Sequence, residues 1–266
     1  MTMKVVLFCG GEGMRMKEHA DAIPKPMVNI GNRPLLWNVM KYYAHFGFKD
    51  FILCLGYQAE YIKNYFLNYN EYLANDFTLS NGGKDLTLYN KDMEDWNITF
   101  ADTGARACVG ERLRAVKKYL EGEKYFLANY SDGLTNFNIH EMVNFVKTSG
   151  KMAGFLSART NQSFHVVDVH NDGGVKGINP IAGADIWINV GYFMLHTDIF
   201  EYLEPGDELV IEAFNRLIEM DELISMKFEG FWCPMDTFKD KQYLEKLYEG
   251  GSPPWEVWNN AEEGKC

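Results

Sequence analysis

A glycine-rich turn near the start of the chain combines residue types suited to binding phosphate. The apolar run Val5-Val6-Leu7-Phe8 is long enough for one buried strand, and the turn after it contains three glycines, Gly10, Gly11 and Gly13. Glycines directly after a strand let the backbone turn tightly and bring its N–H groups close to an anion. Arg15 adds a fork of donors, and Lys25 adds a point charge between two prolines. Most glycine-rich turns bind no ligand, so the glycines alone are weak evidence for a site. Their combination with Arg15 and Lys25 indicates a site for nucleotide phosphates.

Two aspartates lie where a carboxylate can take part in chemistry. Asp132 follows the apolar stretch 125–130 and precedes a glycine, which places it at the carboxyl end of an expected strand. Asp236 follows a proline and bulky neighbours that restrict its direction. Each has a structural alternative, because Asp before Gly is a frequent turn residue and Asp236-Thr237 can cap the following helix. Local sequence alone leaves both interpretations open.

The glycine pattern excludes two common kinds of nucleotide-binding loop. A dinucleotide fingerprint needs a third glycine three residues after the second, and here Met16 occupies that position. A Walker-type loop needs Gly-Lys-Ser/Thr, which is absent from the turn.

Composition favours a cytoplasmic α/β enzyme. The formal net charge is −11 with no basic run, so we expect no nucleic acid partner. Five scattered cysteines without a Cys-x-x-Cys pair are typical of reduced thiols. The sequence shows neither a signal peptide's apolar region nor a transmembrane segment, so no membrane partner is expected. The sequence leaves the oligomeric state open, with a homo-oligomer as one possibility.

Strand-like and helix-like segments alternate along the chain. The patterns predict strands at 4–8, 51–55, 125–130, 152–159, 164–170, 174–178, 187–195 and 223–229. They predict helices at 34–46, 58–68, 111–121, 208–220 and 238–248, a helix capped by Asn138 and ended by Gly150, and a hairpin or loop excursion at 75–100. This order predicts a single α/β, Rossmann-like nucleotidyltransferase domain over 1–258 and a tail over 259–266. Its mixed, mostly parallel sheet should hold the ligand at the carboxyl ends of its strands.

The motifs resemble those of a known superfamily in collinear order from residue 3 to about 258. The glycine turn and Pro24-Lys25-Pro26 are similar to the signature of sugar-phosphate nucleotidyltransferases, and the whole chain most resembles glucose-1-phosphate cytidylyltransferases. The matching stretches are Pro34-Leu35-Leu36-Trp37, Gly56-Tyr57, Asp102-Thr103-Gly104, Gly110-Glu111-Arg112-Leu113, Asp132-Gly133, Trp187-Ile188-Asn189 and Gly230-Phe231-Trp232-Cys233-Pro234-Met235-Asp236-Thr237.

The resemblance implies a role for each matching residue. Arg15 and Lys25 would be catalytic, and Asp132 and Asp236 would bind the metal, Mg²⁺ with Mn²⁺ as an alternative. The nucleotide would contact Gly10, Gly11, Gly13, Thr103, Gly104 and Arg112. The acceptor would contact Trp187 and Asn189. Lys176 or Arg159 is expected to restore the contact with its phosphate, because the family's lysine is missing from this chain. Arg112 has the alternative of a solvated helix arginine, and Trp187 that of a core aromatic.

The implied reaction needs neither a general base nor a covalent nucleophile. CTP and a phosphomonoester bring about six negative charges together, because the second pKa of the monoester lies near ~6. The ionised acceptor phosphate can attack the α-phosphorus directly and expel pyrophosphate. Catalysis would therefore be positioning and charge stabilisation by the metal, Arg15 and Lys25.

Departures from the family concentrate on the acceptor side. Family members usually carry Glu-Lys-Pro before the Trp-Ile-Asn strand, whereas this chain has Gly177-Ile178-Asn179-Pro180. We therefore expect a cytidylyltransferase that uses CTP and a phosphorylated small molecule, either a sugar 1-phosphate or an unusual acceptor. One alternative is a phosphoglutamine-type cytidylyltransferase of surface polysaccharide modification. Two alternatives of other classes are a non-catalytic nucleotide sensor and a Rossmann oxidoreductase.

Overall fold

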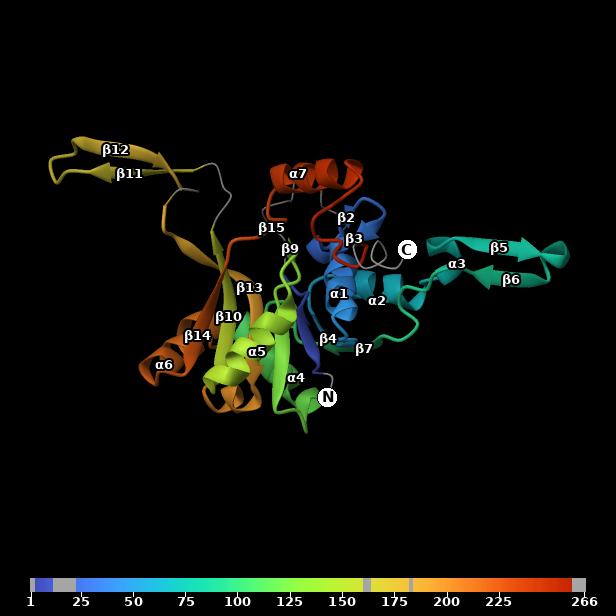
Figure 1. The fold of residues 1–266 in the computed structure, drawn as a ribbon. Coiled ribbons are helices and arrows are strands. Elements are labelled where there is room, and N and C mark those ends of the chain that lie inside the picture. The colour runs from blue at the N-terminus through green and yellow to red at the C-terminus, as the bar shows by residue number, and fades with distance from the viewer. Residues whose placement is uncertain (1–2, 12–22, 160–163, 182–183, 260–266) are drawn as a thin grey trace.

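The computed structural model describes residues 3–11, 23–159, 164–181 and 184–259, and its ribbon is drawn in Figure 1. The strands are β1 (Val5–Phe8), β2 (Asn29–Ile30), β3 (Arg33–Pro34), β4 (Asp50–Leu55), β5 (Phe77–Ser80), β6 (Asp85–Leu88), β7 (Asn97–Asp102), β8 (Tyr125–Asn129), β9 (Gly133–Thr135), β10 (Ala153–Arg159), β11 (His165–Val169), β12 (Val175–Pro180), β13 (Trp187–His196), β14 (Leu223–Phe228) and β15 (Trp232–Pro234). The α-helices are α1 (Leu35–His45), α2 (Ala59–Leu67), α3 (Glu71–Ala74), α4 (Val109–Val116), α5 (Ile139–Ser149), α6 (Phe214–Glu219) and α7 (Phe238–Glu249).

The central sheet has seven strands in the order β14-β10-β13-β8-β1-β4-β7. β1 pairs in parallel with both β4 and β8, and β13 pairs antiparallel with β8 and β10. All strands of this sheet except β13 therefore run in one direction. The prediction of a mixed, mostly parallel sheet is confirmed.

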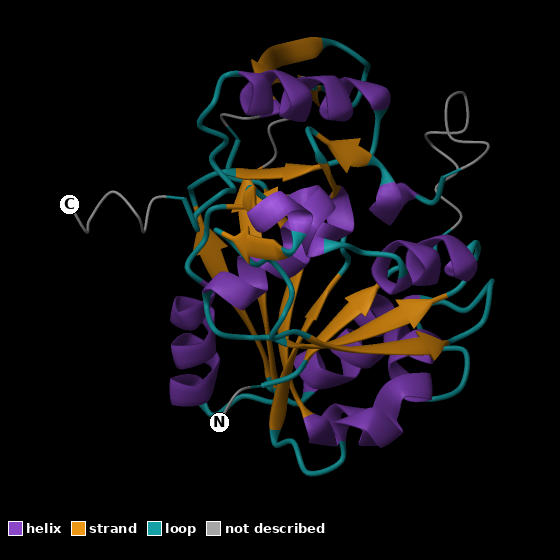
Figure 2. Cartoon of the chain, turned by 90° about the vertical axis from the view of Figure 1, so that its right-hand side faces the viewer, coloured by secondary structure: helices purple, strands orange, loops and turns teal. Residues whose placement is uncertain are grey.

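Helices cover both faces of the sheet, as the two views together show (Figures 1 and 2). Val5 and Leu7 of β1 face a core that also contains buried residues of α1 and α5. Val6 and Phe8 face the opposite core, beneath α4 and α6. This alternation follows from the two-residue period of a strand and explains why β1 is apolar throughout.

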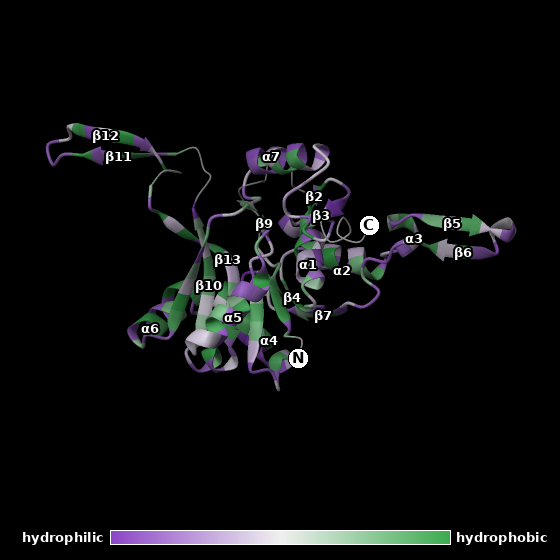
Figure 3. Cartoon of the chain, viewed as in Figure 1, coloured by the Kyte–Doolittle hydropathy of each residue, from purple (hydrophilic) through white to green (hydrophobic). Residues whose placement is uncertain are grey.

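Two hairpins project from the body as arms (Figure 1). One arm is β5–β6, which lies within the excursion predicted at 75–100. The other is β11–β12, which we call the 165–180 arm; all five residues of β11 are exposed. Hydrophobic residues dominate the strands of the central sheet, whereas both arms carry hydrophobic and hydrophilic stretches (Figure 3).

Most predicted elements are present within a few residues of their expected bounds. The helix expected at 111–121 begins two residues earlier and ends in a 3-10 turn, Lys117–Leu120. The helix expected at 208–220 starts as a π-helix, Leu209–Ala213. Asn138 caps α5 and Gly150 ends it in the left-handed conformation, as predicted. Short strands β2, β3, β9 and β15 and helix α3 were not predicted, because two to four residues carry too little periodicity. The assignment of 75–100 to an excursion was wrong at its end, where β7 begins at Asn97 and joins the edge of the central sheet beside β4. In the described part of the chain, no helix has the length and apolarity needed to span a membrane.

Candidate active site

One edge of the central sheet collects the predicted site residues. The carboxyl ends of β1, β4, β7, β8, β10 and β14 lie at this edge, which we call the carboxyl edge. Gly10 follows β1, Thr103 follows β7 and Asp132 follows β8. The antiparallel strand β13 begins at the same edge with Trp187. Residues far apart in sequence therefore meet where ligands bind in open α/β sheets.

Lys25 and the two aspartates form an ion cluster at this edge. The Lys25 ammonium donates to Asp132 Oδ2 at 2.9 Å and to Asp236 Oδ1 at 2.7 Å. The Lys25 side chain is only 15% exposed. Burial on its own lowers the pKa of Lys25, but the two carboxylates outweigh it and raise the pKa above its ordinary value. Lys25 is therefore fully charged at neutral pH.

A small two-stranded sheet explains why the aspartates lie together. Pro234 of β15 pairs with Gly133 of β9, which brings Asp132, one residue before Gly133, near Asp236, two residues after Pro234. The Met235 N–H also donates to the Asp132 carbonyl at 2.8 Å. Thr237 begins α7 as its N-cap, with a capping box to Asp240. The capping alternative is thus correct for Thr237, and it leaves the Asp236 carboxylate directed at Lys25.

The turn before Asp132 has a strained backbone at Ser131, and a hydrogen bond to β1 keeps it in place. Ser131 has a φ of 58°, in the left-handed region that side-chain-bearing residues rarely adopt. Ser131 is fully buried, and its hydroxyl donates to the Phe8 carbonyl at 2.7 Å. This contact fastens the turn after β8 to the end of β1. The direction of the Asp132 carboxylate is therefore fixed by the neighbouring strand.

The cluster fits a divalent metal ion. Both carboxylates contact one nitrogen, so their oxygens are close enough to share one cation, and hard carboxylate oxygens are the ligands that Mg²⁺ prefers. No group of three or more His, Cys, Asp or Glu side chains with metal-ligand geometry occurs among the described residues. Two carboxylates, with water and substrate phosphate as the other ligands, match the usual Mg²⁺ pattern rather than an all-protein cage.

Arg112 is buried and turned toward the backbone of three loops. It is 4% exposed, so the alternative of a solvated helix arginine is wrong. Its guanidinium donates to Gly10 O at 2.8 Å, Thr103 Oγ1 at 2.8 Å, Gly104 O at 2.9 Å and Leu55 O at 3.2 Å. It thereby joins three of the predicted nucleotide-binding residues. Gly11 is exposed beside them, whereas Gly13 and Arg15 lie outside the described residues.

The predicted acceptor residues are distributed over two separate regions. Lys176 lies on the 165–180 arm, where its ammonium is 3.7 Å from Asp168, and the arm extends away from β9, β15 and α7 (Figure 1). The structure thus does not bring Lys176 to the ion cluster. Trp187 and Asn189 lie on β13 at the carboxyl edge, and Asn189 Oδ1 accepts from the Gly191 N–H at 2.9 Å.

Two cations lie near the Trp187 ring: Arg159, which the sequence offers as one of two candidates for the contact with the acceptor phosphate, and Lys227, which was not predicted. The Arg159 guanidinium carbon lies 5.1 Å from the Trp187 ring centroid, and the Lys227 ammonium lies 4.7 Å from it. Arg159 also lies 3.6 Å from Asp185 and 3.9 Å from Glu229. Arg159 ends β10 and Lys227 is the penultimate residue of β14, so both lie at the carboxyl ends of parallel strands, and this position is the signal that points to them. Trp187 is half-buried, not a core residue.

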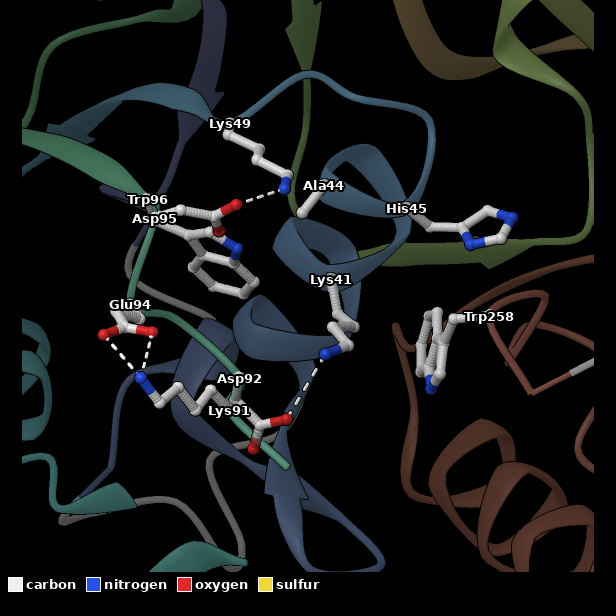
Figure 4. A pocket seen from close by; sticks show the side chains of 10 residues that line it. All are labelled: Lys41, Ala44, His45, Lys49, Lys91, Asp92, Glu94, Asp95, Trp96 and Trp258. Atoms are coloured by element: carbon white, nitrogen blue, oxygen red, sulfur yellow. Dashed lines mark hydrogen bonds and ion pairs between the residues drawn. The ribbon is translucent and has the colours of Figure 1, made fainter. Parts of the chain in front are cut away.

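A pocket of about 350 Å³ lies at the opposite edge of the sheet (Figure 4). It contains Lys49, which precedes β4, and Trp96, which precedes β7, and both belong to the amino ends of the parallel strands. Its three lysines are each paired with a carboxylate, namely Lys41 with Asp92, Lys49 with Asp95 and Lys91 with Glu94. This pocket is therefore separate from the ion cluster.

Comparison with known proteins gives consistent matches over nearly the whole chain. A family model described as "Nucleotidyl transferase" matches residues 4–247. The glucose-1-phosphate cytidylyltransferase of Salmonella typhimurium is 36% identical over 258 residues, covering 96% of this chain and 100% of that protein. The probable glucose-1-phosphate cytidylyltransferase of Bacillus subtilis is 35% identical with the same coverage.

Solved structures match at the level of the fold. The UTP-bound UGPase from Acinetobacter baumannii superposes with a TM-score of 0.71 at 19% identity and covers 100% of both chains. A putative glucose-1-phosphate thymidylyltransferase from Bacillus anthracis superposes with a TM-score of 0.67 at 13% identity, covering 92% of this chain and 95% of that one. The single α/β fold predicted from the sequence is thus that of known nucleotidyltransferases.

Proposed function

This chain belongs to the nucleotidyl transferase family, and we propose that it transfers the cytidylyl group of CTP to a small phosphorylated acceptor with release of pyrophosphate. The observation that carries the proposal is the end-to-end similarity to two glucose-1-phosphate cytidylyltransferases. The ion cluster of Lys25, Asp132 and Asp236 supports it, because it combines a fixed cation with a pair of metal-ligating carboxylates. Membership of this family makes the Rossmann oxidoreductase alternative wrong.

The chemistry proposed for the site is direct displacement at phosphorus. An oxygen of the ionised acceptor phosphate attacks the α-phosphorus of CTP, and the bond to the pyrophosphate leaving group breaks. Lys25 has three N–H donors, and two of them donate to the carboxylates. The third N–H can donate to a phosphate oxygen of the nucleotide as negative charge develops on it during transfer. Arg15 is proposed to help stabilise the same charge. A divalent ion, Mg²⁺ or Mn²⁺, held by Asp132 and Asp236 would neutralise phosphate oxygens when bound.

Buried thiols are consistent with a reaction that has no cysteine nucleophile. Burial raises the pKa of Cys9, beside the glycine turn, to about 12. It also raises the pKa of Cys233, three residues before Asp236, to about 12. Both groups are protonated thiols at neutral pH, and only a thiolate is an effective nucleophile.

The acceptor subsite is proposed to lie at Arg159, Trp187 and Lys227. Ile178 and Asn179, which replace the family's Glu-Lys pair, lie on the exposed 165–180 arm. Arg159 and Lys227 instead supply two cations at the carboxyl edge, 5.1 Å and 4.7 Å from the centroid of the Trp187 ring. The ring can pack against an apolar face of the acceptor while the cations meet its phosphate.

Glucose 1-phosphate is expected to be a poor acceptor. The missing pair removes a carboxylate that would hold sugar hydroxyls and a cation that would neutralise the acceptor phosphate. Losing one charge-assisted hydrogen bond costs roughly 1.5–3 kcal/mol, or about 10- to 150-fold in efficiency. The curated relatives carry glucose 1-phosphate in their names, so this departure is a specific claim about this chain. A phosphorylated amino acid amide such as phosphoglutamine is the alternative acceptor.

A pyrophosphate-release screen tests both the reaction and the acceptor. CTP, UTP, dTTP, ATP and GTP are each combined with a panel of sugar and non-sugar phosphates in the presence of Mg²⁺. We expect CTP to be the preferred donor and another acceptor to exceed glucose 1-phosphate in kcat/KM. Pyrophosphate release with no combination would favour the non-catalytic sensor. Glucose 1-phosphate as the best acceptor would show that Arg159 and Lys227 replace the lost contacts in full.

Cytoplasmic location and a homo-oligomeric state stay predictions.

A further inference from the structure

Two buried polar side chains, Asn129 and Tyr192, lie next to the turn that carries Asp132. They stand directly opposite each other in the antiparallel pairing of β8 with β13, and each residue is only 1% exposed. Opposite residues of an antiparallel pair point to the same face of the sheet, so both side chains lie on the face of the core that contains α1. The rings of Tyr42 and Tyr43 pack against Tyr192 with centroids 5.8 Å and 6.0 Å away. The hydroxyl of Tyr192 is therefore held in one place.

These two side chains bind the turn on either side of Asp132. Asn129 Oδ1 accepts from the Ser131 N–H at 2.6 Å. The Tyr192 hydroxyl donates to the Gly133 carbonyl at 2.8 Å. The residue before the aspartate and the residue after it are thus each bonded to a buried side chain. The Asp132 side chain, which is 33% exposed, extends from a backbone that is held at both ends.

The turn needs such contacts because its backbone is strained. The left-handed φ of 58° at Ser131 is one that side-chain-bearing residues keep only when the surrounding structure enforces it. Burying a carboxamide and a phenol hydroxyl also costs free energy of desolvation, which an apolar pair at 129 and 192 would avoid. Backbone strain and buried polar groups are retained where local geometry serves a site. The residue at the centre of this geometry is Asp132.

We propose that Asn129 and Tyr192 are positioning residues that fix the Asp132 carboxylate for the divalent cation of the transfer reaction. The inference rests on the proposed function, which assigns the cation to Asp132 and Asp236. Mg²⁺ requires near-ideal octahedral geometry with oxygens at about 2.0–2.1 Å, so a ligand on a mobile turn binds it less well. Groups that hold a ligand in place strengthen metal binding without touching the metal.

The test compares Tyr192→Phe with Tyr42→Phe. Tyr192→Phe removes one hydroxyl and keeps the packing of the ring. Tyr42 is also buried, and its hydroxyl donates to the Phe137 carbonyl at 2.7 Å, so Tyr42→Phe removes the same kind of hydrogen bond away from the turn. Both variants should lose similar thermal stability, since each loses one buried hydrogen bond. Asn129→Ala is the second variant, because it removes the acceptor of the Ser131 N–H.

The readout is the part of CTP binding that depends on the metal. Calorimetry gives the Kd for CTP with excess Mg²⁺ and again with a chelator, and the ratio of the two values is the metal-dependent gain. Tyr192→Phe and Asn129→Ala should each lower this gain about three- to tenfold, while CTP binding in the chelator stays within about twofold of wild type. Tyr42→Phe should keep the gain within about twofold. A residue that serves stability alone would leave the gain unchanged.

The inference is overturned if the Tyr192 and Asn129 variants keep the full gain, or if Tyr42→Phe loses as much as they do. Asp132→Asn, measured in the same way, separates this failure from that of the proposed function. If Asp132→Asn loses the gain while the Tyr192 and Asn129 variants keep it, the metal assignment holds and only this inference is wrong. If Mg²⁺ does not strengthen CTP binding in the wild-type protein, the metal assignment is wrong, and this inference with it. If one of the two variants does not fold, the other decides the result.

Discussion

The nucleotide side and the acceptor side of the carboxyl edge are built in different ways. On the nucleotide side, Arg112 is buried and bonded to the ends of three neighbouring strands, and glycines fit against it without room for a methyl group. On the acceptor side, Arg159 is about 40% exposed, and its two carboxylate neighbours, Asp185 and Glu229, are each 76% exposed. The loops of the nucleotide side are held together by the guanidinium of Arg112. The acceptor side consists of exposed ion pairs, whose partners can exchange each other for water.

This difference indicates how each side can change. Exposed ion pairs contribute about 0–1 kcal/mol to stability, so residues such as Arg159 can be exchanged without loss of the fold. Breaking the contacts of a buried charge costs several times more, because the remaining partners lose their hydrogen bonds. A new acceptor can therefore evolve while the nucleotide side stays constant. Ile178 and Asn179, which replace the family's Glu-Lys pair, are exposed on the 165–180 arm, where a change of side chain likewise costs little stability.

The ion cluster lies between the two sides, and removing its charge should have the largest effect. Asp132→Asn and Asp236→Asn each keep the shape of the side chain but remove a proposed metal ligand. We expect turnover to fall about a thousandfold or more, since a metal supplies several kcal/mol of charge stabilisation in the transition state. Pyrophosphate release at saturating Mg²⁺ measures the change.

Asp172→Asn is the matched control, because Asp172 lies in the turn of the 165–180 arm and accepts from the Gly174 N–H. It should leave turnover unchanged. Near-normal rates in either cluster variant would show that the metal assignment is wrong. The nucleotide side and the acceptor side would then have no metal ion between them at Asp132 and Asp236.

Loss of the phosphate-directed cations should have the next largest effect. Lys25→Ala and Arg15→Ala should lower kcat about a hundredfold and change the KM for CTP less, because charge builds on the α-phosphate and the leaving pyrophosphate during transfer. Lys41→Ala, which removes a lysine at the opposite edge of the sheet, is the control. If the two variants keep kcat and only raise the KM for CTP, these cations act in the binding of CTP alone. The nucleotide side would then not stabilise the transition state in the way that we propose.

The sequence predicted the fold because the fold depends on local signals. Apolar runs followed by glycine or aspartate marked the ends of β1 and β8, and the parallel arrangement then placed those ends at one edge. The pairing of Asp132 with Asp236 came only from the family resemblance. The strands that produce this pairing, β9 and β15, have three residues each, which is too short to show a period in the sequence.

The partners of side chains were harder to predict. Arg112 has the same local context as a solvated helix arginine, and its burial depends on carbonyls up to 102 residues away. Lys176 was preferred for the acceptor because it lies near the missing Glu-Lys pair in sequence, yet that segment forms a projecting arm. Lys227 was overlooked because its approach to Trp187 depends on β14 and β13 lying on the two sides of β10. Contacts across a sheet are set by strand order, which no single segment encodes.

The smallest effect should come from the exposed cations of the acceptor side. Arg159→Gln and Lys227→Gln should each raise the KM for the acceptor about tenfold, because a charge-assisted contact with phosphate is lost at a site that water can reach. The KM for CTP should stay within about twofold of wild type, since neither residue contacts the loops held by Arg112.

Lys176→Gln decides between the two locations for the acceptor phosphate. It removes the same charge from the 165–180 arm, where Lys176 now lies beside Asp168. If the acceptor lies at the carboxyl edge, only the Arg159 and Lys227 variants raise its KM. If Lys176→Gln raises it and Lys227→Gln does not, the arm must fold over the site during catalysis. The acceptor side would then be assembled by a conformational change, in contrast to a nucleotide side that is already formed in this structure.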